Sequence, residues 1–402
     1  MRTLIILIFS IFLLTDVSAK IRQKCLESVP FEMVGSYVVI KVRINNSSPL
    51  NLILDSGIRN TIITELLAGD KISLNYSDVK ELMGLGGGDH LGALTSNFNT
   101  LRIGKLKIQP KTVYVLQEDI FNLSKHSGSK INGLIGVDFF EEYTIEVDYS
   151  ARRIRFYDKN KEFQCPKDYE SIPLTLEAHK MYIELSVLES DSTRRNAKML
   201  IDTGAELNAW FQTFKNGSIR VPEKGIRGTI GQGLNGEIVG KFGRLPQICF
   251  GKFCLKNPVV SFPDSASIAQ IVGNSDRDGT VGSQLLSRFN YVIDYGKKLF
   301  YFKPNGNFSN PFKYNVAGIE ITQIIPFVPQ TEVWLVWENS PAARAGVKVG
   351  DQIVEINGQK SFLLKIEEIK FIFETPSKSP LNLVIQRDGV EIPLTIDMKS
   401  QL

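Results

Sequence analysis

The chain has 402 residues, of which 43% are hydrophobic, and a formal net charge of +4. Because this length exceeds what one hydrophobic core usually accommodates, we expect more than one folded domain. The small net charge is not clustered, so the sequence gives no reason to expect a nucleic-acid partner.

The N-terminus has the features of a signal peptide. Arg2 supplies a positive charge, residues 4–14 are almost wholly apolar, and residues 17–19 form a small-residue cleavage site. The apolar run is too short to span a bilayer comfortably, although an uncleaved anchor is the alternative. No later segment is apolar enough to cross a membrane, so we expect no integral membrane span once residues 1–19 are removed. The mature chain is predicted to be exported to a periplasm, a cell surface or the medium.

An acidic residue directly follows a short apolar run at two places. The two triplets are Asp55-Ser56-Gly57, after the apolar residues 50–54, and Asp202-Thr203-Gly204, after residues 199–201. Each apolar run predicts a buried strand, and each glycine lets the chain turn where that strand ends. Burying a carboxylate costs free energy unless the group is hydrogen-bonded or protonated. A chain that does so twice in the same local setting is expected to bring the two acids together.

The surroundings of the triplets repeat along the chain. The paired segments, each separated by 146 or 147 positions, are Asp55 and Asp202, Gly104 and Gly251, residues 133–136 and 279–282, and residues 143–149 and 289–295. Such a constant spacing predicts two homologous lobes, each about the size of a small domain. Short alternating segments and turn signals dominate residues 31–303, which predicts a mainly β fold, with short helices at 138–142 and 283–288.

A glycine-rich stretch follows the triplet in each predicted lobe, at residues 84–92 and 228–236. Glycine clusters between alternating segments predict mobile hairpin tips. A phosphate-binding loop is the rival interpretation, but no Gly-Lys-Ser/Thr follows either stretch and no helix pattern begins there. Ordinary loop flexibility is the other alternative.

The two triplets in matching surroundings resemble the catalytic loops of aspartic peptidases, a family that includes the two-lobed pepsins and the single-lobed retroviral enzymes. The resemblance implies two homologous, mainly β lobes of the double-psi β-barrel type, with Asp55 and Asp202 as the catalytic dyad. It implies that the dyad is supported by Ser56, Gly57, Thr203, Gly204, Gly136 and Gly282. It also implies flap residues that bind the substrate, namely Gly86, Gly87, Gly88, Ile230, Gly231 and Gly233.

Two features depart from the commonest pattern of this family. No tyrosine lies within residues 84–92, where a pepsin flap usually carries one, so the flaps resemble the retroviral kind. Arg59 stands where the family commonly has a small residue, and we place its side chain at the surface. A serine or cysteine peptidase is disfavoured, because the three histidines are scattered singly and no Gly-x-Ser-x-Gly motif is present.

The chain contains four cysteines, Cys25, Cys165, Cys249 and Cys254. An even number in an exported chain favours disulfides, with three possible pairings. Cys249 and Cys254 flank a short hairpin, where they could face each other. Cys25 and Cys165 each lie just before the first strands of a lobe, and we expect them to pair. The cysteine spacing and the scattered histidines do not fit a zinc site, so we expect no metal and no cofactor.

The character of the sequence changes after residue 304. Residues 305–311 have the composition of a linker, and residues 340–358 closely resemble a PDZ domain of the bacterial high-temperature-requirement type. Residues 342–345 predict a short helix, and Gly346 caps it. The resemblance implies a groove for a peptide or protein C-terminus, lined by a helix at 367–373 and by a loop and strand at Ala317, Gly318, Ile319, Glu320 and Ile321.

The sequence therefore predicts a signal peptide (1–19), an N-terminal lobe (20–160), a C-terminal lobe (161–304), a linker (305–311) and a small α+β PDZ domain (312–402). The function expected is that of an exported aspartic endopeptidase acting on polypeptides. The alternative is a catalytically silent protein that binds peptides in its cleft and PDZ domain. A weaker third hypothesis is self-assembly, in which the PDZ domain binds residues 400–402 of another copy.

Overall fold

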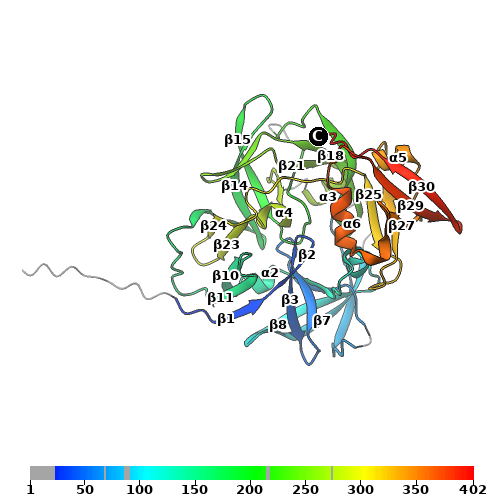
Figure 1. The fold of residues 1–402 in the computed structure, drawn as a ribbon. Helices are drawn as coiled ribbons and strands as arrows, with labels where there is room; N and C mark the ends of the chain where they lie inside the picture. The colour runs from blue at the N-terminus through cyan, green and yellow to red at the C-terminus, as the bar shows by residue number, and fades with distance from the viewer. Residues whose placement is uncertain (1–22, 68, 86–90, 214–217, 273–274) are drawn as a thin grey trace, which may run out of the picture.

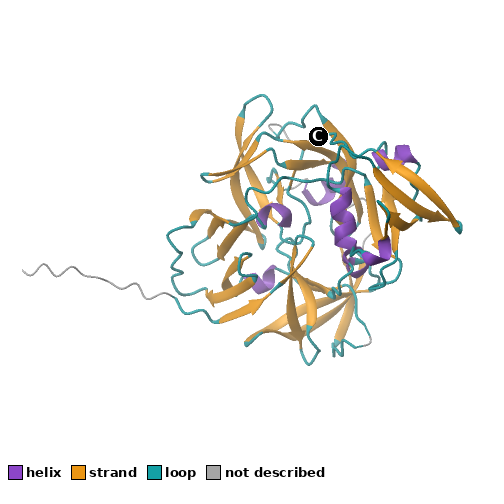
Figure 2. Cartoon of the chain, in the orientation of Figure 1, coloured by secondary structure: helices purple, strands orange, loops and turns teal. Residues whose placement is uncertain are grey.

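The structure is a computed structural model that describes residues 23–67, 69–85, 91–213, 218–272 and 275–402. The predicted signal peptide and the flap residues Gly86, Gly87 and Gly88 lie outside the described residues. Strands dominate the part of the chain that is described (Figure 2). Within these ranges, no helix is both long and apolar enough to cross a membrane.

The first lobe is built on an eight-stranded sheet with the order β2-β3-β4-β9-β5-β8-β7-β6. Its strands are β2 (Glu32–Val34), β3 (Tyr37–Ile44), β4 (Leu50–Leu54), β5 (Thr61–Ile63), β6 (Tyr76–Leu82), β7 (Leu91–Ile103), β8 (Leu106–Leu116) and β9 (Gly133–Ile135). Two short helices, α1 (Leu123–Ser127) and α2 (Val137–Phe140), flank β9. The apolar run that precedes the first triplet is β4, a mostly buried strand that lies parallel to β9.

The second lobe repeats this arrangement on a sheet with the order β17-β18-β21-β16-β22-β15-β14-β19-β20, to which β13 adds beside β14. Its strands are β13 (Thr175–Glu177), β14 (Lys180–Leu188), β15 (Arg194–Ile201), β16 (Ala209–Phe211), β17 (Gly225–Gly233), β18 (Gly236–Arg244), β19 (Gln247–Phe250), β20 (Phe253–Lys256), β21 (Val259–Pro263) and β22 (Gly279–Val281). The helices are α3 (Ser265–Val272) and α4 (Ser283–Leu286). Strands β15, β22, β16 and β21 pair with one another in the same sense as β4, β9, β5 and β8, so the two lobes share one topology.

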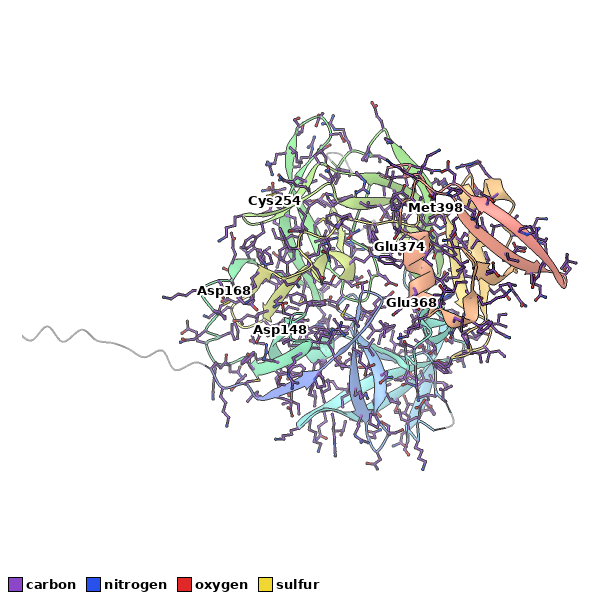
Figure 3. The ribbon with its side chains drawn as sticks, in the orientation of Figure 1. Asp148, Asp168, Cys254, Glu368, Glu374 and Met398 are labelled. Carbon is purple, nitrogen blue, oxygen red and sulfur yellow. A yellow bond between two sulfur atoms is a disulfide. The ribbon has the colours of Figure 1, made fainter. Side chains whose placement is uncertain are left out.

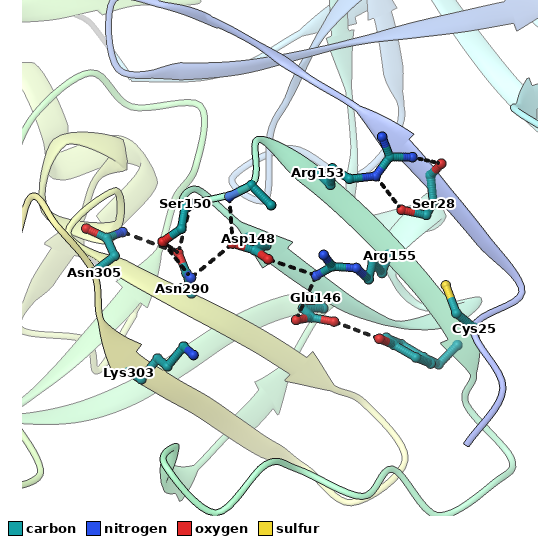
Figure 4. Close-up of polar contacts among 12 residues, drawn as sticks. Cys25, Ser28, Glu146, Asp148, Ser150, Arg153, Arg155, Asn290, Lys303 and Asn305 are labelled. Carbon is teal, nitrogen blue, oxygen red and sulfur yellow. Dashed lines mark hydrogen bonds and ion pairs between the residues drawn. The ribbon is translucent and has the colours of Figure 1, made fainter. Parts of the chain in front are cut away.

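A six-stranded sheet joins the lobes, with the order β1-β11-β10-β23-β24-β12. Its strands are β1 (Glu27–Pro30), β10 (Tyr143–Asp148), β11 (Arg153–Asp158), β12 (Glu170–Pro173), β23 (Phe289–Asp294) and β24 (Leu299–Pro304). Polar contacts cross its centre, where Asn290 donates a 3.0 Å hydrogen bond to Asp148 and Arg155 pairs with both Asp148 and Glu146 (Figure 4). Because β10 and β23 come from different lobes and are hydrogen-bonded side by side, this sheet fixes the lobes relative to each other.

The C-terminal region forms a separate sheet with the order β25-β26-β27-β29-β30, with β28 beside β27. Its elements are β25 (Ile319–Gln323), β26 (Thr331–Val336), α5 (Pro341–Ala345), β27 (Gln352–Ile356), β28 (Gln359–Lys360), a 3₁₀ turn (Ser361–Leu363), α6 (Ile366–Phe373), β29 (Leu381–Arg387) and β30 (Val390–Ile396). The Ser340 hydroxyl accepts a hydrogen bond from Ala343 at the start of α5, and Gly346 ends this helix in the left-handed conformation. This small α+β unit lies against one side of the two lobes (Figure 1).

The segment predicted to be a linker is held in place by one side chain. The guanidinium of Arg288 donates hydrogen bonds to the carbonyls of Asn307, Phe308, Asn310 and Pro311 and lies 3.7 Å from the centre of the Phe312 ring. The C-terminal domain is therefore tied to the second lobe at its first residues.

Candidate active site

The two aspartates occupy equivalent places at the ends of equivalent strands. The Asp55 amide donates a 3.0 Å hydrogen bond to the Ile135 carbonyl, and the Asp202 amide donates one of the same length to the Val281 carbonyl. In each lobe a neighbouring parallel strand, β9 or β22, therefore fixes the backbone of the acid. The Asp55 side chain is buried, and Asp202 is partly buried.

Four hydrogen bonds link the two triplets across the lobe interface. The Ser56 hydroxyl donates to the Ile201 carbonyl at 2.7 Å, and the Thr203 hydroxyl donates to the Leu54 carbonyl at 2.6 Å. Each hydroxyl also accepts a 3.0 Å hydrogen bond from the other triplet. The Ser56 amide donates to the Thr203 hydroxyl, and the Thr203 amide donates to the Ser56 hydroxyl. Both side chains are almost fully buried, so this reciprocal network joins the triplets rigidly.

The glycine of each triplet lies against the acid of the other. A Cβ atom added to Gly57 would lie 2.5 Å from Asp202 Oδ2, and one added to Gly204 would overlap the carboxyl group of Asp55. Each glycine amide also donates a hydrogen bond to its own acid, at 2.8 Å in the first triplet and 3.1 Å in the second. The structure therefore brings Asp55 and Asp202 together, with room for no side chain at either glycine.

The two glycines predicted to support the triplets lie behind them. A Cβ on Gly136 would collide with the Arg59 carbonyl, and one on Gly282 would collide with the Leu207 carbonyl. Glycine is required at both positions because the loop after each triplet passes directly over them. Arg59 itself is exposed, as expected.

The electrostatic surroundings of the two acids differ. Burial and the adjacent Asp202 carboxylate raise the pKa of Asp55 well above its usual range. Burial also raises the pKa of Asp202, but the Arg277 guanidinium and the Lys180 ammonium oppose this shift. Two carboxylates this close do not both ionise readily. The asymmetry favours a proton on Asp55 and a negative charge on Asp202.

The second flap hairpin lies over the same cavity as the acids. It is formed by β17 and β18, and Ile230 packs in an apolar cluster with Trp210 and Ile238. Gly233 lies against the Leu85 carbonyl, while Gly231 has open space around it. The β6–β7 hairpin of the first lobe approaches from the other side, since the Asn235 amide donates a 2.9 Å hydrogen bond to the Leu85 carbonyl. The described parts of the two hairpins meet at the cavity.

One cavity of about 1960 Å³ contains the two acids and extends to the C-terminal domain. From that domain, Ile319, Glu320 and Thr322 on β25 and Lys370 and Phe371 on α6 line it. The strand and helix predicted to bound the peptide groove therefore face the same space as the aspartates.

Aromatic contacts hold the C-terminal domain in this position. Trp337 stacks on Phe242 of the second lobe, with ring centres 5.1 Å apart and planes at 10°. Trp334 contacts His126 of α1 in the first lobe at 4.9 Å. Burial lowers the pKa of His126 to about 4, so its ring is neutral near pH 7.

The structure corrects the predicted mode of peptide binding at the C-terminal domain. The amides of Val316 and Ala317 donate to the Phe373 carbonyl at the end of α6, and the amides of Gly318 and Ile319 donate to the side-chain oxygen of Asn315. None of these four amides is left for a terminal carboxylate.

Two acids also stand near this loop. Burial raises the pKa values of Glu320 and Glu374, and Figure 3 places Glu374 at the end of α6. In their ionised form, these two glutamates repel a bound carboxylate. Among the described residues, no strand pairs with the outer edge of β25, although α1 packs against this strand and Gly128, just after α1, lies near Gln323.

One of the two expected disulfides is present in the structure. Cys249 and Cys254 face each other across the β19–β20 hairpin and form a disulfide. The expected pair of Cys25 and Cys165 is wrong for this structure, in which both are free. Both pack against the same apolar cluster, but the Cys25 thiol donates to the Glu27 carbonyl instead. Among the described residues, no group of histidine, cysteine and acidic side chains has the arrangement of a metal site.

Two cavity residues were missed from the sequence, Lys180 and Arg277. Neither lies in a motif. They can be recognised only when the two lobes are aligned by strand register. In this alignment Lys180 is equivalent to Tyr37, and Arg277 is equivalent to Ile131.

Parts of this chain are similar to known protein families and to individual proteins. Residues 40–139 match the aspartyl-protease family, and residues 335–387 match the PDZ family. A probable protease of Enterococcus faecalis, eep, is 29% identical over 102 residues, so the chain spans about a quarter of that relative and the match covers 24% of the chain. The aspartic proteinase of Irpex lacteus aligns with 71% of this chain and 98% of its own, at 14% identity and a TM-score of 0.40. The chain therefore contains an aspartyl-protease domain followed by a PDZ domain.

Proposed function

We propose that the chain is an exported aspartic endopeptidase that hydrolyses polypeptides with a water held between Asp55 and Asp202. One observation carries this proposal: each acid lies against the glycine of the other triplet, and four hydrogen bonds join the triplets. Placing one buried and one partly buried acid side by side in this symmetric way has a large electrostatic cost. A protein that only bound peptides would have no need of it.

The chemistry follows from the unequal surroundings of the two acids. Ionised Asp202 accepts a proton from the water, whose oxygen attacks the peptide carbonyl carbon. Protonated Asp55 donates a hydrogen bond to the carbonyl oxygen as negative charge develops there. The proton taken up by Asp202 then passes to the leaving nitrogen, and the C–N bond breaks. No covalent intermediate with the protein forms, and Ser56 and Thr203 act as support.

The PDZ domain is proposed to hold part of the same polypeptide. Its outer strand β25 and helix α6 line the cavity of the aspartates, and strand addition needs only a free edge. Because the loop amides are already engaged and two glutamates stand beside them, we assign an extended internal segment to this groove, not a C-terminal carboxylate.

Export and the domain limits 20–160, 161–304 and 312–402 are part of the proposal. The Cys249–Cys254 disulfide supports an oxidising location, and the apolar N-terminus supports a signal peptide.

A peptide library digested across a range of pH tests the proposal. The chain is expected to cleave internal bonds, and pepstatin is expected to inhibit the cleavage. Asp55→Asn and Asp202→Asn are expected to abolish it while still binding peptides. Cleavage that survives either substitution, or a wild-type chain that binds peptides and never cuts them, would refute the endopeptidase assignment.

A further inference from the structure

We propose that the second lobe contributes a cationic subsite, formed by Arg277 and Lys180, that binds a carboxylate of the substrate next to the scissile bond. The inference rests on the proposed function and specifies its substrate class. The first lobe offers an apolar surface in the equivalent place. The preferred substrate therefore has an apolar side chain on one side of the bond and a carboxylate on the other.

The difference between the lobes appears in the row of paired residues beneath the cavity. Residues paired across adjacent strands point to the same face of a sheet. In the first lobe the row is entirely apolar or aromatic and consists of Val39, Ile53, Leu134, Ile62 and Tyr114. In the second lobe the equivalent row consists of Tyr182, Leu200, Thr280, Trp210 and Ser261. Two apolar positions of the first row have thus become hydroxyl positions in the second.

Arg277 stands where the first lobe has Ile131. Its side chain is only 3% exposed and lines the cavity, with the guanidinium 5.2 Å from the centre of the Trp210 ring. The guanidinium donates no hydrogen bond to any described residue, and its buried Nε has no partner. Buried guanidinium groups are normally paired. An arginine held on an aromatic face with its donors unused is suited to bind an oxyanion.

Lys180 stands where the first lobe has Tyr37, and it lines the same cavity. Burial and the neighbouring Arg277 lower the pKa of Lys180, and its amine makes no hydrogen bond or ion pair with the described part of the chain. The hydroxyl of Thr280 lines the same cavity and is buried, and it has no hydrogen-bond partner among the described residues. Asp202 is the carboxylate that faces both cations, and it carries one negative charge against two positive ones. One positive charge is left for a ligand.

Fluorogenic peptides with blocked ends test the preference. Each has leucine on one side of the scissile bond and either glutamate or glutamine on the other, in both orders. We expect kcat/KM to be roughly 10- to 100-fold higher for glutamate than for glutamine at one of the two positions, as for a charge-assisted hydrogen bond. A second arm uses shorter peptides that end at this position and carry either a free C-terminal carboxylate or a carboxamide. This arm distinguishes recognition of a side-chain carboxylate from recognition of a terminal carboxylate.

Two variants and a control connect the preference to these residues. Arg277→Ile, which copies the first lobe, and Lys180→Met are each expected to lower the glutamate-to-glutamine ratio towards one. Lys180 is only partly buried, so its variant is informative even if Arg277→Ile folds poorly. Lys161→Met removes an exposed charge outside the cavity and is expected to leave the ratio unchanged.

The outcomes separate this inference from the proposed function. Cleavage with equal rates for glutamate and glutamine at both positions would overturn the subsite while the endopeptidase assignment stands. If the wild-type chain cuts no peptide, the endopeptidase assignment fails. In that case, calorimetry measures the binding of the same peptides to the Asp55→Asn variant and tests whether the subsite exists. Tighter binding of the glutamate peptide supports it, and equal binding overturns it.

Discussion

The hydroxyl of Thr203 offers a direct test of the network that joins the lobes. In Thr203→Val the side chain keeps its shape but loses the hydrogen bond to the Leu54 carbonyl and the acceptor for the Ser56 amide. A buried amide without a partner costs roughly 1–3 kcal/mol, and a lost bond at a carbonyl costs about 1 kcal/mol. The free energy of unfolding is therefore expected to fall by about 2–4 kcal/mol.

Thr61→Val is the matched control. Thr61 is also fully buried in a strand, but its hydroxyl has no hydrogen-bond partner in the described part of the chain. Removing an unpaired hydroxyl relieves a desolvation cost, so this variant is expected to be neutral or more stable by about 1 kcal/mol. Urea unfolding of the wild type and of both variants measures the difference.

Activity provides a second readout of the same substitution. Because Thr203 holds the loop of the opposite acid, kcat is expected to fall by at least tenfold in Thr203→Val and to stay unchanged in Thr61→Val. Equal stability losses in the two variants, or a loss below about 0.5 kcal/mol for Thr203→Val, would refute the role of the network.

Three further predictions concern other parts of the chain. Burial with two neighbouring glutamates raises the pKa of Glu374 to about 7, so the folded state binds this proton more tightly than the unfolded chain. Stability is lost as the pH rises from about 4.5 to 7, and Glu374→Gln is expected to stabilise the chain by roughly 3 kcal/mol at pH 8 and not at pH 4, as thermal unfolding would show. Gly204→Ala is expected to displace Asp55 and lower kcat at least 100-fold, in peptide assays, without unfolding the chain. Replacing Cys249 and Cys254 by serine opens a short loop and is expected to cost about 2 kcal/mol in denaturant unfolding.

Much of the fold was predictable because local chemistry repeats at a fixed spacing. The triplets at Asp55 and Asp202 needed a strand before them and a glycine after them, and both requirements are written in adjacent residues. The short helices expected at 138–142 and 283–288 are found as α2 and α4; α2 begins one residue earlier than expected, and both helices end two residues earlier. Their position follows from the same repeat.

The parts that were missed depend on contacts between distant segments. Arg277 lies in no local sequence motif, and its role in the cavity is recognised only by comparison with Ile131 at the equivalent position of the other lobe. The placement of β25 on the cavity of the aspartates depends on the packing of Trp337 and Trp334 against the two lobes. The sequence does not reveal that the backbone amides of residues 316–319 donate hydrogen bonds to the Asn315 side chain and to the carbonyl at the end of α6. The number of cysteines alone could not show that the Cys25 thiol donates a hydrogen bond to the nearby Glu27 carbonyl.

The central claim is that Asp55 and Asp202 act as one catalytic unit on a single water. The most direct measurement compares kcat/KM of Asp55→Asn, Asp202→Asn and the double variant on one peptide. If the acids act together, each single variant loses as much activity as the double variant. Losses that add, or a single variant that retains substantial cleavage, would contradict the claim.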